Sequence, residues 1–192
     1  MKRKSTDNRR MSAPPEFTDI AIKGEAPLRP NLRFMLAHPA HLIALGFGSG
    51  LSPKAPGTVG TLWAWLTFIL LGWGMSDWQW ALIIIASTLV GWWACTVTAL
   101  HLEQSDSSHM VADEIVAFWL ILWVIQPASI WQQLLAFGVF RFFDAVKFGP
   151  TAWADRAFKG FGWRGGWGVM LDDLVAALLT LLVLALMQRM LA

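Results

Sequence analysis

Long stretches without charged residues dominate the second part of the chain. Ala55–Ser76, Trp78–Leu100 and Ile115–Phe140 contain no Asp, Glu, Lys or Arg over 22, 23 and 26 residues. A fourth stretch, Leu174–Gln188, covers 15 residues and continues as apolar sequence beyond Arg189. A helix that crosses a bilayer needs about 20 mostly apolar residues. The pattern therefore predicts a polytopic membrane protein.

The third of these stretches contains Pro127 near its middle. Proline removes a helical hydrogen bond and disfavours helix in the residue before it. We therefore interpret this region as a helical hairpin at about 110–147, rather than as one long span. The fold class is then all-α, a small polytopic membrane helix bundle of about five helices, some of them short of a full span. The expected helices lie near 58–75, 78–100, 110–126, 129–147 and 170–191.

Composition supports this class and excludes others. The chain is 56% hydrophobic and 15% charged, with a mean hydropathy of +0.50, whereas soluble domains carry about 25% charged residues. The single cysteine, Cys95, excludes a disulfide framework and a cysteine-cluster metal site. No basic face continues into the apolar part of the chain, so we expect no nucleic-acid partner.

Positive charge is concentrated near the N-terminus. Residues 1–54 carry nine Lys or Arg against four Asp or Glu, whereas the remainder carries six against nine. The positive-inside rule then places the N-terminus in the cytoplasm. We expect 1–37 to be a disordered basic cytoplasmic tail and 38–192 to be the membrane-embedded domain, beginning with an interfacial helix near 38–47. This topology brings four polar segments to the cytoplasmic face, namely 46–58, 101–114, 141–168 and 172–173.

Carboxylates stand at the ends of the apolar stretches, where an ionised group is costly unless it is compensated. These residues are Asp113, Glu114, Asp144, Asp172 and Asp173. Gathered on one face they would repel one another, and Mg²⁺ removes that repulsion because it prefers oxygen ligands together with substrate phosphate. The alternative is that each acidic residue caps a helix. Five such residues in one membrane protein favour the Mg²⁺ site.

Basic residues accompany one of these carboxylates. Arg141, Asp144 and Lys147 are spaced i, i+3, i+6, which keeps them within an arc of about 120° on a helix. They form intrahelical salt bridges, or Arg141 and Lys147 bind a phosphate while Asp144 binds a metal. Both readings stay open from the spacing alone.

Two glycine-rich segments, Gly46–Gly60 and Gly162–Gly168, precede predicted helices. A loop that opens a helix offers backbone N–H groups and the positive end of the helix dipole to an anion. The alternative is that both segments are simple turns. Within the first segment the candidate phosphate-binding residues are Ser52, Lys54, Gly57 and Thr58.

Four motifs in this order resemble the phosphatidylglycerophosphatase A family of bacterial lipid phosphatases, and they cover about residues 42–178. Ala117 and Phe148 depart from the family pattern, which affects loop geometry more than chemistry. The matching segments are Gly48–Pro53 with Ala55–Thr61, Val111–Val116, Phe140–Lys147 with Pro150, and Gly165–Asp173.

The resemblance implies an enzyme, a Mg²⁺-dependent phosphoric monoester hydrolase of phospholipid metabolism. It would convert phosphatidylglycerophosphate to phosphatidylglycerol and phosphate at the bacterial cytoplasmic (inner) membrane, with its active site on the cytoplasmic side. Asp106 resembles a family aspartate upstream of the Asp113–Glu114 pair. The family's catalytic residues map to Asp113, Glu114, Asp144, Lys147, Asp172 and Asp173, the carboxylates among them being the metal ligands.

Two alternatives remain from the sequence. One is a lipid phosphomonoesterase with another substrate, such as phosphatidic acid. The other is a non-enzymatic transporter whose carboxylates bind a cation at the membrane midplane. The position of the carboxylates at helix ends, without an inverted repeat, favours the phosphatase. The sequence leaves the number of metal ions and the oligomeric state open.

Overall fold

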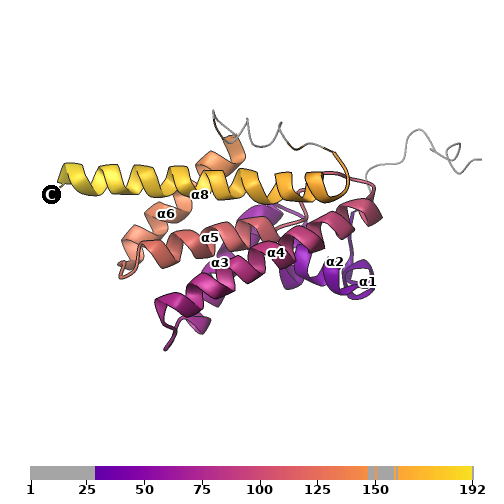
Figure 1. The fold of residues 1–192 in the computed structure, drawn as a ribbon, viewed down its shortest axis with the longest axis horizontal. Helices are drawn as coiled ribbons and strands as arrows, with labels where there is room; N and C mark the ends of the chain where they lie inside the picture. The colour runs from indigo at the N-terminus through magenta and orange to yellow at the C-terminus, as the bar shows by residue number, and fades with distance from the viewer. Residues whose placement is uncertain (1–28, 147–149, 151–157, 159, 192) are drawn as a thin grey trace, which may run out of the picture.

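The computed structural model describes residues 29–146, 150, 158 and 160–191. This part of the chain is helical and contains no strand, which confirms the predicted all-α class (Figure 1). The predicted helices appear as α3, α4, α5, α6 and α8, and shorter elements precede them. The elements are α1 (Leu32–Leu36), α2 (Pro39–Ala44), the 3₁₀ segment η1 (Gly46–Leu51), α3 (Pro56–Leu71), α4 (Asp77–Leu102), α5 (Ala112–Val124), α6 (Ile130–Val146) and α8 (Trp163–Leu191).

The hairpin prediction is confirmed. Helix α5 ends at Val124, helix α6 begins at Ile130, and the two helices contact each other. The interruption falls at Pro127, where the missing N–H and the ring of proline oppose a continuous helix. A single span over this region is therefore excluded.

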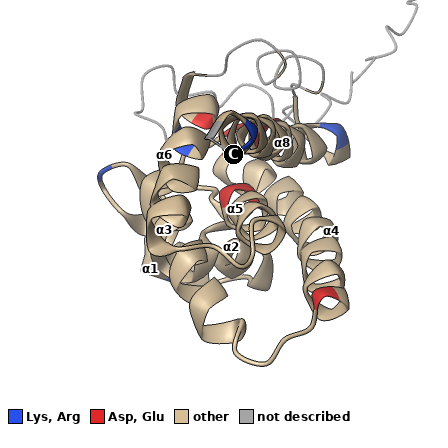
Figure 2. Cartoon of the chain, turned by 90° about the vertical axis from the view of Figure 1, so that its left-hand side faces the viewer, with Lys and Arg blue, Asp and Glu red and all other residues tan. Residues whose placement is uncertain are grey.

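Helix α5 is the central helix of the bundle. It contacts α3, α4, α6 and α8, which surround it in the end-on view of Figure 2. Phe118 and Ile121 of α5 are fully buried, and Phe118 stacks on Phe140 of α6 with ring centroids 5.8 Å apart. Because α5 is enclosed on all sides, the residues of its first turn are held at the centre of one end of the bundle.

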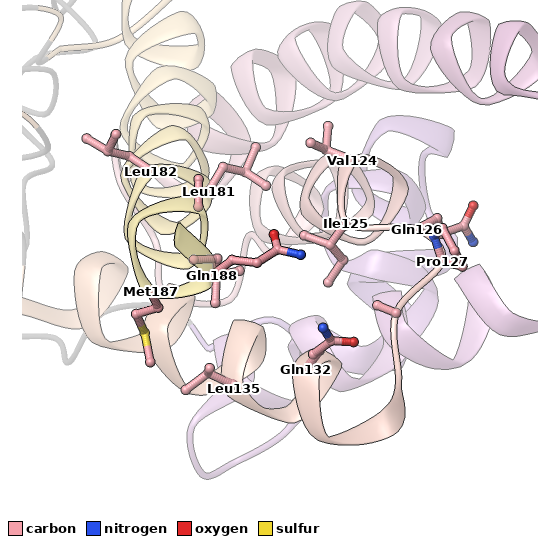
Figure 3. A pocket seen from close by; sticks show the side chains of 13 residues that line it. Val124, Ile125, Gln126, Pro127, Gln132, Leu135, Leu181, Leu182, Met187 and Gln188 are labelled. Atoms are coloured by element: carbon pink, nitrogen blue, oxygen red, sulfur yellow. The ribbon is translucent and has the colours of Figure 1, made fainter. Parts of the chain in front are cut away.

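The turn between α3 and α4 and the turn between α5 and α6 lie together at the other end of the bundle from the first turn of α5. Trp123 near the end of α5 donates a hydrogen bond to Asp77 at the start of α4, at 3.4 Å. Trp65 of α3 donates one to Gln133 of α6, at 2.6 Å. A cavity of about 920 Å³ opens here between the α5–α6 turn and the last turns of α8, and Figure 3 shows Gln188 beside Ile125 at its centre.

Among the described residues, α4 and α8 are the helices long and apolar enough to cross a membrane. Their candidate spans cover 26 and 28 residues with mean hydropathies of 1.8 and 2.4. Helix α3 has 16 residues and α5 has 13, so α5 is about 20 Å long at 1.5 Å per residue. The expectation that some helices fall short of a full span agrees with these lengths.

Two expected boundaries are wrong. The segment 162–168, expected to be a loop, lies mostly inside α8, which begins at Trp163 and not near residue 170. A Cβ atom at Gly166 would collide with Thr96 of α4, so this glycine lets the two helices pack closely. The tail expected over 1–37 ends earlier, because Leu32–Leu36 forms α1; residues 1–28 lie outside the described residues.

A histidine pair ties the N-terminal elements to α4. His41 of α2 is 4% exposed, and its Nδ1 donates to the carbonyl of Phe34 at 2.8 Å. A carbonyl only accepts, so in the neutral ring Nε2 accepts a hydrogen bond from Nδ1 of His101, at 2.7 Å. Burial lowers the pKa of His41 below its ordinary value near 6.5, and the nearby His101 and His38 lower it further, whereas the bond to Phe34 opposes the shift.

Stability is therefore expected to fall as the pH drops from about 6.5. The unfolded chain takes up a proton at the ordinary pKa, whereas the buried ring in the folded chain resists protonation until a lower pH. Thermal unfolding in detergent across pH 5 to 8 measures this loss. In His41→Gln, which cannot be protonated, this part of the pH dependence should disappear, and an unchanged profile would contradict the assignment.

Candidate active site

A polar cavity of about 380 Å³ lies at the end of the bundle opposite the helical turns. Segments far apart in the sequence meet there: the starts of α3 and α5, the loop before α5, the end of α6 and the first part of α8. This is the convergence of polar segments that the sequence predicted. The lining residues are Ala55, Pro56, Gly57, Asp106, Ser107, Ser108, Met110, Asp113, Glu114, Arg141, Asp144, Ala145, Asp172 and Asp173.

Helix α5 contributes two of the cavity's carboxylates. Asp113 is 8% exposed and stands with Glu114 in the first turn of the helix. The backbone N–H of Val111, just before this turn, donates to the carbonyl of Ala44 at 2.8 Å and fixes where α5 starts. Carboxylates in the first turn meet the positive end of the helix dipole. The helix dipole stabilises the charges of Asp113 and Glu114, but it does not explain why further carboxylates lie beside them in the cavity.

Arg141 is the cation of this cavity among the described lining residues. Its Nη1 lies 3.1 Å from Oε1 of Glu114 and 2.5 Å from Oδ2 of Asp144. The same nitrogen donates to the hydroxyl of Thr61, at 3.4 Å. The salt bridge to Asp144 is the i, i+3 contact that the spacing allowed, and the contact to Glu114 joins α6 to α5. The arginine therefore holds two carboxylates in fixed positions.

The positive charge of one arginine does not satisfy these carboxylates. Asp113 Oδ1, Glu114 Oε2 and Asp173 Oδ2 are buried and have no hydrogen-bond partner within the described part of the chain. Glu114, Asp144 and Asp173 each direct one oxygen to a common point, and these oxygens lie within 4.8 Å of one another. Buried, unpaired carboxylate oxygens are costly, and a set of hard oxygen ligands is what Mg²⁺ prefers. The donor set therefore fits a divalent cation.

The start of α3 packs directly against the carboxylates. A Cβ atom at Gly57 would collide with Oε1 of Glu114 and would lie 2.9 Å from a guanidinium nitrogen of Arg141. Glycine is thus required at this close approach. The first N–H groups of a helix have no partner within it, so the first turn of α3 brings unpaired donors to the rim of the cavity.

Gly57→Ala is expected to lower activity at least tenfold, because the methyl group displaces Glu114 and Arg141, and displacements of about 1 Å at an active site cost up to 10²-fold. The measurement is the initial rate of phosphate release, the reaction that the resemblance implies, by the purified variant. Ala86→Leu in α4 is the control, because Ala86 is exposed and does not line the cavity. Equal rates for the two variants would remove Gly57 from the site.

Most of the residues predicted from the sequence meet in this cavity, but three do not line it. Ser52 donates its hydroxyl to the carbonyl of Lys54 at 2.8 Å, Lys54 is exposed, and Thr58 lies just behind Gly57. The backbone at Ala55 adopts a left-handed conformation with φ of 45°, which redirects the chain so that only 55–57 face the cavity. Lys147 lies outside the described residues.

The structure adds residues that sequence reasoning did not select. Ser107 and Ser108 line the cavity beside Asp106, and the buried hydroxyl of Ser107 has no hydrogen-bond partner in the described residues. Thr61 supports Arg141 and also donates to the carbonyl of Gly57, at 2.9 Å. The sequence could have indicated Ser107 and Ser108, because both lie in the polar segment between Asp106 and Asp113.

Comparison with known proteins identifies this arrangement. A family model described as phosphatidylglycerophosphatase A matches residues 42–188, which includes every residue lining the cavity. The chain belongs to the phosphatidylglycerophosphatase A family. The predicted resemblance is confirmed, and so is the prediction that the chain is a phosphatase enzyme.

Similar proteins from bacteria cover most of the chain. The phosphatidylglycerophosphatase A of Escherichia coli (strain K12) is 36% identical over 152 residues, which is 77% of this chain and 83% of that protein. The phosphatidylglycerophosphatase A of Haemophilus influenzae is 33% identical over 160 residues, 83% of this chain and 94% of that protein. A Bacteroides thetaiotaomicron protein named "Putative phosphatidylinositol-3-phosphatase" is 37% identical over 153 residues, 75% of this chain and 90% of that protein.

No solved structure matches the chain. The bacterial relatives and the two long apolar helices together indicate a membrane protein.

Proposed function

We propose that this chain hydrolyses phosphatidylglycerophosphate to phosphatidylglycerol and inorganic phosphate, with Mg²⁺ as its cofactor. The observation that carries the proposal is the cavity in which unpaired buried carboxylate oxygens, an arginine and the start of a helix converge. The names of the Escherichia coli and Haemophilus influenzae relatives support this substrate.

Glu114, Asp144 and Asp173 are the residues that would hold Mg²⁺, since their oxygens face one another within 4.8 Å. Asp113 and Asp172 line the same cavity and add negative charge around this group. When bound, Mg²⁺ supplies Lewis-acid neutralisation of the phosphate oxygens and lowers the pKa of a nearby water.

The chain's own residues then position and stabilise the phosphate. Arg141, oriented by Glu114 and Asp144, stabilises charge that develops on the phosphate oxygens. The first N–H groups of α3 offer further donors, and Gly57 lets the helix approach closely enough for them to reach the cavity. Lys147 adds a second positive charge in this proposal, as the family motif implies.

Water attacks phosphorus, the P–O bond to the lipid breaks, and the departing oxygen takes up the proton that the water has lost, so that the lipid leaves as its alcohol. One of the cavity carboxylates accepts the proton of the attacking water. The diacylglycerol part of the substrate stays in the apolar phase, so only the headgroup enters the cavity. A site at one end of the helix bundle, and not at its middle, suits a substrate held at the membrane surface.

We also place this end of the bundle at the cytoplasmic face of the bacterial inner membrane, with the N-terminus inside. The support is the concentration of Lys and Arg in residues 1–54. A cysteine placed at Ser129, in the exposed α5–α6 turn, tests the topology with a membrane-impermeant maleimide added outside the cell. Cys95 is buried, so the native chain is the unlabelled control. Labelling only after permeabilisation would show that the orientation in the membrane is the reverse of the one proposed.

The function is tested by phosphate release from phosphatidylglycerophosphate in detergent–lipid micelles, with Mg²⁺ and with the metal chelated. Asp113→Asn is assayed beside the native chain. We expect release that requires both Mg²⁺ and Asp113. Phosphatidic acid and phosphatidylinositol 3-phosphate serve as competing substrates, the second because of the printed name of the Bacteroides relative.

The outcomes separate the competing functions. Faster hydrolysis of another phosphomonoester would change the substrate but keep the enzyme class. Phosphate release that persists after chelation would contradict the proposal that Mg²⁺ is the cofactor. No release with any divalent cation, from a chain shown to be folded, would favour the cation transporter.

A further inference from the structure

An apolar groove follows the seam between α6 and α8. It has a volume of about 430 Å³, and Val183 of α8 faces a stripe of α6 across it. The stripe repeats at the spacing of one helix face. Its members are Leu134, Leu135, Gly138, Val139, Phe142 and Phe143.

The groove lies between the two cavities described above, and it shares a lining residue with the large one. Leu135 lines both the groove and the large cavity at the far end of the bundle, where Figure 3 shows it below Met187. At the other end, Ala145 follows Phe142 by one turn of α6 and lines the carboxylate cavity. From Leu135 to Ala145 the helix rises by about 15 Å. This is half of the roughly 30 Å hydrocarbon core, the depth of one lipid leaflet.

Gly138 is the residue that makes this face of α6 hollow. It is exposed in the middle of the helix, and a Cβ atom added there would meet nothing within 4 Å. Glycine is among the poorest helix formers, and no close packing explains it here. Gly57 and Gly166 differ, because a Cβ at either would collide with a neighbouring helix.

We propose that the α6–α8 groove binds an acyl chain of the phosphomonoester lipid whose headgroup occupies the carboxylate cavity, an inference that rests on the proposed function. The occupant follows from three observations on this seam. The lining is apolar, the seam covers about the depth of one leaflet, and the last groove residues of α6, Phe142 and Phe143, lie in the same turn as Asp144 of the headgroup cavity. Bulk lipid would cover any exposed apolar helix face, but it would show no dependence on the headgroup.

The first test compares substrates of different chain length. The quantity measured is the ratio of kcat/KM for dioleoyl to that for dihexanoyl phosphatidylglycerophosphate, because hexanoyl chains end before Gly138. Gly138→Leu adds a side chain to the groove at a position where the added Cβ meets no atom within 4 Å. It is expected to lower this ratio roughly tenfold, the size of effect expected when an apolar pocket loses room for methylene groups. The control is Ala86→Leu on the exposed face of α4, which should keep the native ratio. If Gly138→Leu keeps the native ratio, the proposal that the groove binds an acyl chain of the substrate is wrong.

The second test does not depend on turnover. Phosphatidic acid and phosphatidylcholine, each carrying a diazirine in the middle of one acyl chain, are photolysed with the full chain in phosphatidylcholine nanodiscs. We expect phosphatidic acid to label 134–143 more strongly than phosphatidylcholine does, and Gly138→Leu to lose that excess. The same labelling pattern for both lipids would reduce the groove to a face covered by bulk lipid.

The two tests together distinguish a failure of the proposed function from a failure of the groove proposal. If the native chain releases no phosphate from either chain length, the proposed function fails, and the labelling experiment alone decides whether the groove binds phosphomonoester lipids. If phosphate is released but neither the ratio nor the labelling changes in Gly138→Leu, the function stands and the groove fails.

Discussion

Asp173→Asn is expected to reduce turnover of the lipid substrate by on the order of 10²-fold or more. Asparagine keeps the shape of the side chain but removes the charge from one of the three carboxylates whose oxygens lie within 4.8 Å of one another. Metal stabilisation of transition-state charge is worth several kcal/mol, and each 1.36 kcal/mol changes the rate about tenfold. The measurement is phosphate release at saturating Mg²⁺.

A second readout separates a metal ligand from a residue that only shapes the cavity. Mg²⁺ should raise the unfolding temperature of the native chain, because a ligand that binds only the folded state stabilises it, and Asp173→Asn should lose most of that increase. Asp77→Asn is the matched control, since Asp77 lies at the start of α4, at the end of the bundle where the turns meet. Near-native turnover in Asp173→Asn would withdraw this residue from the metal site.

Arg141→Ala is expected to abolish activity and to lower the free energy of unfolding by about 3 kcal/mol. Removing one partner of a buried ion pair leaves the other charge uncompensated, which typically costs 3–5 kcal/mol. The lower end applies here, because the Arg141 side chain is 20% exposed and solvent screens part of the effect. The structure predicts this loss because both Glu114 and Asp144 contact the same guanidinium nitrogen.

Added Mg²⁺ should restore more stability to Arg141→Ala than to the native chain, since a divalent cation replaces part of the missing positive charge among the carboxylates. Unfolding is measured by chemical denaturation in detergent, with and without Mg²⁺. Arg189→Ala serves as control, because Arg189 stands in the last turn of α8 and interacts there with the helix dipole. An unfolding free energy equal to that of Arg189→Ala would show that the ion pairs contribute little.

The carboxylates that line the cavity could be selected from the sequence because charge is rare in apolar stretches. Asp113, Glu114 and Asp144 stand at the ends of such stretches, and ionised groups there need compensation. The loop residues that line the cavity were harder to select. Ser52 and Lys54 lie in the same glycine-rich segment as Gly57, and no periodic pattern says which of them faces the cavity. The left-handed backbone at Ala55 decides this, and such a conformation is not coded by a hydrophobic pattern.

Helix boundaries also differ in whether the local sequence or the tertiary packing sets them. Pro127 marks the turn between α5 and α6 because proline acts through its own backbone, whatever surrounds it. The glycines at 165–168 suggested a loop, since glycine disfavours helix in isolation. In the folded chain Gly166 lies inside α8, where the absence of a side chain lets α8 pack against Thr96 of α4. Tertiary packing outweighs the local preference at that position.

The sequence by itself determined that this protein is a helical membrane bundle with a cluster of carboxylates at one end, because the lengths of apolar stretches and the positions of charges are one-dimensional properties. Only the tertiary structure decided which carboxylates lie close together, that Arg141 joins α6 to α5, and that Gly138 lines a groove between α6 and α8. These features depend on distances between helices that are far apart in the chain, and the packing around the buried helix α5 sets those distances.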